Sequence, residues 1–160
     1  MPLERVRDLV ELAEETFVDT YADKIDADVL VPYARDVFVP DLTRAVSTKV
    51  SQALWACEDG QPVGYMTLQM VGGSDDPTTV RMDRLYVRAS HRGRGLGRDL
   101  MDEAIRLGRR SGRRSLQLGV WESNTAAIAF YEHVGFKACG EETFVMGDDR
   151  QRDILMCLSL

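Results

Sequence analysis

The residues with the most evident chemical potential form a glycine-rich turn, Arg92-Gly93-Arg94-Gly95-Leu96-Gly97-Arg98, which we call the phosphate turn. A strand-like segment precedes it, and it leads directly into a helix-like one. Backbone N–H groups at a helix N-terminus lack partners and are electropositive, and glycines let a phosphate oxygen approach them without an intervening Cβ. Arginine side chains at positions 92, 94 and 98 would add to these contacts. The turn therefore predicts binding of a phosphate ester, against the simpler interpretation of a solvated connection.

The spacing of the turn excludes two common phosphate-binding loops. A dinucleotide fingerprint needs glycine where Arg98 stands, and a Walker A loop ends in Gly-Lys-Ser/Thr, which is absent. The order Leu85-Tyr86-Val87 followed by Arg92-x-x-Gly95-x-Gly97 instead resembles the acyl-coenzyme A signature of the GCN5-related N-acetyltransferases (GNAT). Further along, Asn124-x-x-Ala127-x-x-x-Tyr131-x-x-x-Gly135-Phe136 is similar to a second motif of that family. The resemblance implies acetyl-CoA as co-substrate and direct attack of an amine on its thioester.

Other segments resemble the PaiA-type polyamine acetyltransferases, so that the likeness extends over nearly the whole chain. They are Glu15–Tyr21, Leu118–Asn124, Phe144–Asp149 and Asp153–Met156. The resemblance implies a polyamine acceptor such as spermidine or spermine. An amino sugar, an amino acid and a protein N-terminus stay open as acceptors, as does a non-catalytic module that binds acetyl-CoA as a metabolic sensor. Acceptor choice is expected to depend on the first helices and on the loop 72–77.

Two residues are expected to move protons. An alkyl ammonium has a pKa near 10.4 and must lose a proton before it attacks. The family comparison places Asp83 as that general base, directly or through water; the alternative is an ion pair with Arg81 or another arginine. Tyr131 matches the family's general acid, which protonates the departing thiolate; the alternative is packing in the core. His91, a loop residue, is the weaker candidate for the base.

The coenzyme is expected to contact backbone as well as side chains. The backbone of Leu85–Val87 would pair with the pantetheine amides like an added strand and could stabilise a developing oxyanion. Asn124 is expected both to cap a helix and to contact the pantetheine arm. The full set predicted to bind acetyl-CoA is Leu85, Tyr86, Val87, Arg92, Gly93, Arg94, Gly95, Gly97, Arg98, Asn124, Ala127 and Tyr131.

Charge is distributed unevenly along the chain. The net charge is −6, and nine carboxylates lie between Glu4 and Asp28, whereas eleven arginines lie between Arg81 and Arg114. An acidic protein is a poor nucleic-acid binder and is well suited to a cationic substrate. Asp19 and Asp23 are the acidic residues predicted, weakly, to bind the acceptor. The arginines at the end of the helix are more simply a solvated face.

Periodicity and turn residues predict a single α/β domain over residues 1–160, with a mixed, mostly antiparallel sheet and about four helices. The first strand of the family is expected to be missing or rudimentary, because the helical pattern begins almost at once. The expected helices are a first one from Leu3, then 26–38 and 41–47 with a break at Pro40, then 96–110 and 124–134. The expected strands are 53–57, 63–71, 79–87, 115–121, 141–147 and 153–160, the first two forming a hairpin that turns at Asp59-Gly60.

Composition restricts the remaining possibilities. Cys57, Cys139 and Cys157 are widely spaced and odd in number, so we expect small buried side chains rather than a disulfide framework or zinc site. His91 and His133 lack a second ligand at helical spacing, and no metal is expected. No apolar run approaches the roughly 20 residues of a membrane span, and the N-terminus is charged where a secretory signal is apolar. A cytoplasmic protein is therefore expected. The resemblance implies that it is an enzyme acting on a small amine, and a homodimer is left open.

Overall fold

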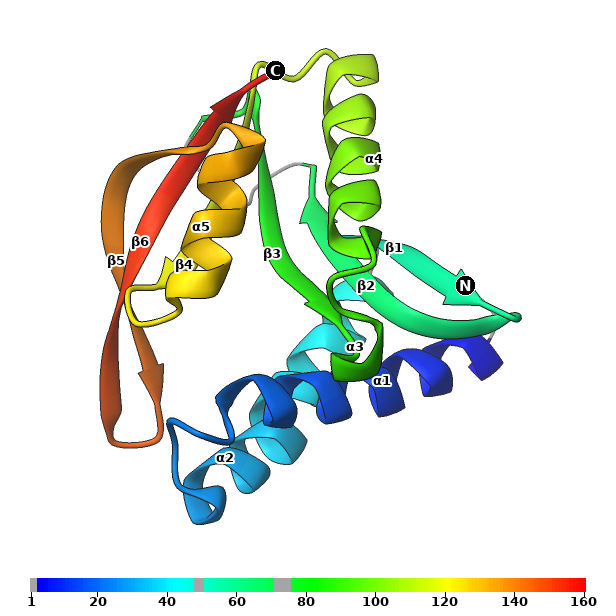
Figure 1. The fold of residues 1–160 in the computed structure, drawn as a ribbon, viewed down its shortest axis with the longest axis vertical. Coiled ribbons are helices and arrows are strands. Elements are labelled where there is room, and N and C mark those ends of the chain that lie inside the picture. Colours follow the sequence, from blue (N-terminus) through cyan, green and yellow to red (C-terminus); the bar gives the residue numbers. More distant parts are fainter. Residues whose placement is uncertain (1–2, 48–50, 71–75) are drawn as a thin grey trace. The chain divides into compact units, whose positions relative to one another are not determined.

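The computed structural model describes residues 3–47, 51–70 and 76–160 (Figure 1). The elements follow the predicted order: α1 (Leu3–Tyr21), α2 (Ala27–Tyr33), η1 (Ala34–Phe38), α3 (Val39–Ser47), β1 (Ser51–Glu58), β2 (Gln61–Gln69), β3 (Thr79–Val87), η2 (Ala89–His91), α4 (Leu96–Arg110), β4 (Ser115–Trp121), α5 (Thr125–Val134), β5 (Lys137–Met146) and β6 (Asp149–Ser159). The described residues hold a six-stranded sheet in the order β1-β2-β3-β4-β6-β5. This α/β architecture confirms the predicted fold class. No strand precedes α1 in the described part of the chain.

The chain forms two compact units. The first comprises residues 1–67 and 84–100, and the second comprises residues 68–83 and 101–160. Strand β3 and helix α4 each have one end in the first unit and the other end in the second. None of the helices in the described ranges combines the length and apolar character that a bilayer-spanning helix needs.

In the first unit, the predicted helix break at Pro40 is wrong. The helix continues through position 40, and the irregularity is a π-helical segment, Ala34–Phe38, immediately before it. The N–H of Val39 bonds to the carbonyl of Ala34, five residues back. Proline has no N–H to donate and crowds the preceding turn, and a widened turn accommodates both defects without ending the helix.

The hairpin of β1 and β2 turns at Asp59-Gly60, as predicted. Both residues have positive φ, 50° and 79°. Positive φ at both central positions is the conformation of a type I′ turn, whose twist matches that of the flanking strands. Asp–Gly is a preferred pair for it, which is why the sequence located this turn correctly.

In the second unit, strand alternation separates an apolar face from a polar one. Strand β4 runs parallel to β3 and antiparallel to β6, with Leu118 opposite Met82 and Met156. All three side chains are buried. Gly108 of α4 packs so closely on Val80 and Leu160 that a Cβ there would collide with Leu160. The alternate residues of these strands carry polar side chains on the other face.

The cysteine prediction is wrong for all three residues. Cys139 and Cys157 form a disulfide between β5 and β6, and Cys57 is exposed rather than buried. The register of the two strands shifts between Ala138 and Gly140, and Cys139 lies in that irregularity. Both strands begin earlier than predicted, at Lys137 and Asp149. The spacing of 18 residues concealed the pairing, because only the register of a long hairpin brings these positions together.

Candidate active site

Two glycines of the phosphate turn adopt a backbone conformation that other residues disfavour. Gly93 and Gly95 have φ values of 73° and 87°, in the left-handed region that side chains disfavour. Apart from the two chain neighbours, no heavy atom of the described residues lies within 4 Å of the position that a Cβ would take at either glycine. Asp99 donates its amide to the carbonyl of Gly95 at the start of α4. A helix N-terminus that faces open space in this way has the arrangement that an anion site requires.

The arginines around this turn are held by carboxylates of the same unit. Arg92 donates to the Val87 carbonyl at 3.0 Å and to Asp19 Oδ2 at 2.6 Å. Arg88 donates to Glu15 Oε2 at 3.1 Å. Asp19, predicted to bind the acceptor, thus lies against an arginine predicted to bind phosphate. Asp23 is exposed beyond the end of α1.

Glu58, which sequence reasoning did not single out, holds the other side of the turn. It pairs with Arg94 through both oxygens, and its Oε2 lies 2.9 Å from His91 Nε2. The other ring nitrogen of His91 lies 2.8 Å from the Ser90 hydroxyl. The hydrogen bond from Arg94 is the main reason why the pKa of Glu58 is lowered. His91 thus serves an ion-pair network, which gives no support to a role as base.

The part of β3 that follows Asp83 is held in place by contacts of its side chains. Arg84 donates to Asp41 Oδ2 at 2.8 Å, and its guanidinium lies 5.0 Å from the centre of the Phe38 ring. Tyr86 packs edge-on against Phe38 and stacks on Tyr65, and burial raises the pKa of Tyr86 well above its usual value. The π-helical segment therefore helps to fix the backbone of Leu85–Val87, which is predicted to contact the coenzyme.

Asp83 lies in the second unit, at the end of the β3 segment that belongs there. Its Oδ2 accepts a hydrogen bond of 2.8 Å from Gln69 Nε2 on β2. This amide donor fixes the orientation of the Asp83 carboxylate.

Beside Asp83, polar side chains extend across β3, β4, β6 and β5. This set, here called the polar face, comprises Arg81, Asp83, Gln117, Trp121, Glu142 and Asp153. Arg81 bridges to Gln117 Oε1 at 3.2 Å and to Glu142 Oε1 at 2.5 Å. The bridge crosses β4 at Gly119, where a Cβ would collide with the Glu142 carboxylate.

Asp153 has the least compensated carboxylate of the polar face. Its Oδ1 is buried and has no hydrogen-bond partner among the described residues. Burial, reinforced by the nearby charge of Glu142 and only partly offset by Arg81, raises the pKa of Asp153 to about 6. Trp121 is its register partner on β4. The sequence placed Asp153 in a family-like segment but gave it no role.

Helix α5 carries the remaining predicted residues. Asn124 caps it, as predicted, by accepting a hydrogen bond of 3.3 Å from the Ala127 amide. The cap uses the side-chain oxygen, so the amide nitrogen keeps its two donors for other partners. Tyr131 is 7% exposed and its ring lies edge-on to Phe130 and Phe136. The helix ends at Gly135, whose φ of 116° suits glycine.

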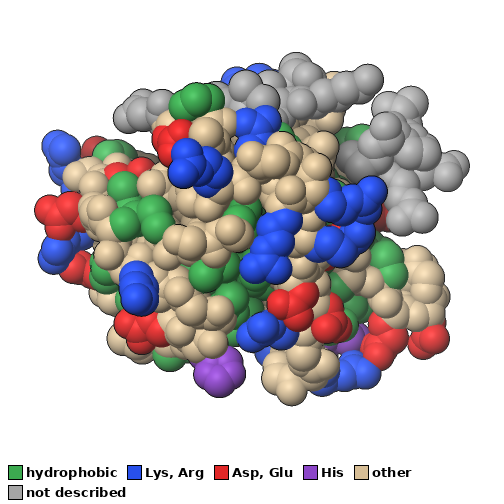
Figure 2. Space-filling view, turned by 90° about the horizontal axis from the view of Figure 1, so that it is seen from above, with side chains coloured by type: hydrophobic (Ala, Val, Ile, Leu, Met, Phe, Trp, Pro, Cys, Tyr) green, Lys and Arg blue, Asp and Glu red, His purple; other side chains and the backbone are tan. Residues whose placement is uncertain are grey.

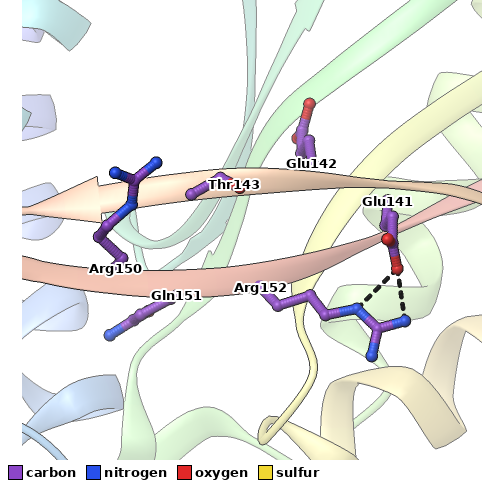
Figure 3. A pocket seen from close by; sticks show the side chains of 6 residues that line it. All are labelled: Glu141, Glu142, Thr143, Arg150, Gln151 and Arg152. Atoms are coloured by element: carbon purple, nitrogen blue, oxygen red, sulfur yellow. Dashed lines mark hydrogen bonds and ion pairs between the residues drawn. The ribbon is translucent and has the colours of Figure 1, made fainter.

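The hairpin of β5 and β6 encloses a depression of about 520 Å³, lined by Glu141, Glu142, Thr143, Arg150, Gln151 and Arg152 (Figure 3). Arg152 reaches Glu141 with two nitrogens, whereas Glu142 points away from that pair. Neighbouring glutamates on β5 thus serve opposite faces of the hairpin. Figure 2 shows both acidic and basic side chains on the face that it displays.

Comparison with known proteins agrees with this geometry. The family model described as acetyltransferase (GNAT) family matches residues 7–136. An uncharacterized N-acetyltransferase of the pepI 3′ region of Lactobacillus delbrueckii subsp. lactis is 32% identical over 153 residues, covering 93% of this chain and 88% of the relative. The peptidyl-lysine N-acetyltransferase YjaB of Salmonella typhimurium is 31% identical over 111 residues, covering 68% and 67%. The spermidine N(1)-acetyltransferase of Thermoplasma acidophilum is 23% identical over 142 residues, covering 86% and 85%.

Solved structures show the same fold. The PaiA N-acetyltransferase from Thermoplasma acidophilum in complex with coenzyme A has a TM-score of 0.79 and 21% identity, covering 100% of this chain and 96% of that one. A GCN5-related N-acetyltransferase from Rhodopseudomonas palustris also has a TM-score of 0.79 and 21% identity, covering 100% and 92%.

Proposed function

Starting from a chain that belongs to the acetyltransferase (GNAT) family, we propose that its acceptor is a polyamine such as spermidine or spermine. The protein is an acetyl-CoA-dependent N-acetyltransferase. The observation that carries the polyamine proposal is the similarity to a spermidine N(1)-acetyltransferase along 86% of this chain. The net charge of −6 supports it, because a polycation is attracted to an acidic protein.

The phosphate turn fits the pyrophosphate of the coenzyme. Its glycines leave open space where side chains would stand, and amides at the start of α4 would be available to an anion. When bound, acetyl-CoA would supply an activated acetyl thioester. Arg92, Arg94 and Arg98 would reinforce the backbone contacts, and the backbone of Leu85–Val87 and the amide nitrogen of Asn124 would contact the pantetheine arm.

Asp83 and Tyr131 divide the proton transfers. Asp83, oriented by Gln69, accepts a proton from the substrate ammonium, directly or through water, so that the nitrogen lone pair is free to attack. As the new C–N bond forms and the C–S bond breaks, Tyr131 donates its phenolic proton to the leaving sulfur. An ordinary phenol has a pKa of about 10, roughly 1.5 units above that of a thiol, so this transfer is uphill by only about 2 kcal/mol and is accessible within the reaction. The acylated nitrogen loses its second proton, which restores the Tyr131 phenol, and Asp83 releases its proton to solvent, leaving the amide product and the free thiol.

A lysine side chain within a protein is the second candidate acceptor. The 31% identity to a peptidyl-lysine N-acetyltransferase favours it. The chemistry at Asp83 and Tyr131 would be the same, since both acceptors present a primary alkyl ammonium. The two functions differ in whether further positive charges on the acceptor contribute to binding.

An acceptor panel tests the proposal. Purified protein is mixed with acetyl-CoA and with spermidine, spermine, butylamine, an amino sugar, an amino acid or a lysine-containing peptide, and free thiol release is followed with a thiol reagent. We expect the highest kcat/KM with spermidine or spermine. The highest value with the peptide would transfer the assignment to protein lysines, and binding of acetyl-CoA without thiol release from any acceptor would indicate a sensor.

A further inference from the structure

We propose that Asp153, together with the ring of Trp121, holds a second ammonium group of the acceptor while Asp83 serves the amine that is acetylated. This inference rests on the proposed function. It adds a residue that determines acceptor specificity, on a strand to which the mechanism assigns no role.

The charges of the polar face compensate Asp153 only in part. Arg81 is the basic member of this set, and it donates to Gln117 and Glu142. Its bridge to Glu142 is locally neutral. Asp153 Oδ1, on the adjacent strand, is buried without a hydrogen-bond partner in the described ranges. A buried carboxylate oxygen without a partner is costly, and an ammonium ligand would remove that cost.

Trp121 provides a second attraction for the same ligand. Trp121 and Asp153 are directly paired in the antiparallel ladder, so their side chains lie on the same side of the sheet with Cβ atoms about 5 Å apart. An indole face attracts ammonium groups through its quadrupole, most strongly where water is partly excluded. A carboxylate beside an indole is therefore a combination suited to a cation and unsuited to an anion.

The sheet geometry sets the length of the acceptor. Asp83 follows directly after Met82, the partner of Leu118 on β4, whereas Asp153 is the partner of Trp121. The two aspartates thus lie two strand spacings apart across the sheet, about 10 Å, and about two residues apart along it, roughly 7 Å. Their separation is about 12 Å. Amines separated by a chain as long as that of spermidine can reach both carboxylates, and those of ethylenediamine cannot.

A pair of acceptors matched in length tests the proposal without any mutation. Diaminooctane and aminooctanol differ only in whether the distal group is an ammonium or a hydroxyl. We expect the wild-type protein to show a KM about tenfold lower for diaminooctane, with kcat values within about twofold. Ethylenediamine should gain no such advantage over ethanolamine.

Variants assign the effect to the residue. Asp153→Asn should raise the KM for diaminooctane about tenfold and leave that for aminooctanol unchanged. The matched control is Glu141→Gln, which removes a carboxylate from the opposite face of the same hairpin and should change neither. Thermal melting checks that both variants fold.

The outcomes separate this proposal from the one beneath it. Equal KM values for the two octyl acceptors in the wild type would overturn the cation subsite while leaving amine acetylation intact. A uniform effect of Asp153→Asn on both acceptors would also overturn it, by indicating a structural role. Failure of the wild type to acetylate any amine would overturn the proposed function and the subsite together.

Discussion

The phosphate turn and the polar face differ in how far their charged side chains are paired with opposite charges. Around the turn, Arg88, Arg92 and Arg94 each have a carboxylate partner, and the proposed anion site consists of backbone amides in a conformation that glycine permits. On the polar face the carboxylates outnumber the arginine, and the proposed chemistry depends on side chains. We infer that the turn governs coenzyme affinity, whereas the polar face and α5 govern turnover and acceptor choice.

The largest effect is expected from removing the Tyr131 hydroxyl, which lies outside the phosphate turn. Tyr131→Phe should lower kcat by about 10²- to 10⁴-fold, because general acid catalysis contributes on that scale. Coenzyme affinity should stay within about twofold, since the turn is untouched. Single-turnover kinetics and calorimetry measure the two quantities separately. Retention of wild-type acetyl transfer would make the hydroxyl a bystander.

Next in size is a change to the backbone of the turn. Gly95→Val forces a branched side chain into a φ of 87° and fills the space where a phosphate would lie. Acetyl-CoA affinity should fall at least tenfold, about 1.4 kcal/mol. Gly112→Val is the matched control, because Gly112 also has a positive φ, 68°, but lies beyond the far end of α4. Unchanged affinity in a folded Gly95→Val protein would refute the placement.

The uncompensated charge of Asp153 predicts an effect on stability with a defined pH dependence. Its pKa is raised from about 3.9 when unfolded to about 6 when folded, so ionisation opposes folding. The penalty is absent below about pH 4, where both states are protonated, and complete above pH 6. Asp153→Asn should therefore raise stability at pH 7.5 by about 1 kcal/mol after allowance for solvent screening, or roughly 2–4 °C in Tm. The gain should vanish at pH 4, and a gain independent of pH would contradict this assignment.

The smallest expected effect is that of Asp19→Asn, and the structure changes which ligand this variant is expected to bind less tightly. The sequence suggested that Asp19→Asn would weaken binding of a polyamine. Because Asp19 holds Arg92, we now expect mainly a change in the KM for acetyl-CoA. Exposed pairs contribute up to about 1 kcal/mol, so the change should be at most about fivefold. A loss of preference for spermidine over butylamine, at constant KM for acetyl-CoA, would return Asp19 to the acceptor site.

What the sequence predicted well depends on local rules. The turn at Asp59-Gly60 and the cap at Asn124 each follow from the conformational preferences of one or two residues. The disulfide and the bridge from Arg81 to Glu142 depend on strand register across long separations, which no local pattern encodes. Pro40 is a strong local signal for the end of a helix, but the π-helix before it allows the helix to continue. The predicted loop at 72–77 lies mostly outside the described residues.

The central claim, acetyl transfer to a polycation, is tested most directly by the ratio of kcat/KM for spermidine to that for butylamine. Thiol release from acetyl-CoA would be followed with the wild-type protein at low and at physiological ionic strength. We expect spermidine to be favoured at least about tenfold at low salt, or about 1.4 kcal/mol, and the preference to shrink as salt screens the charges within roughly 8–10 Å. Equal values for the two amines, or a preference insensitive to salt, would contradict the claim.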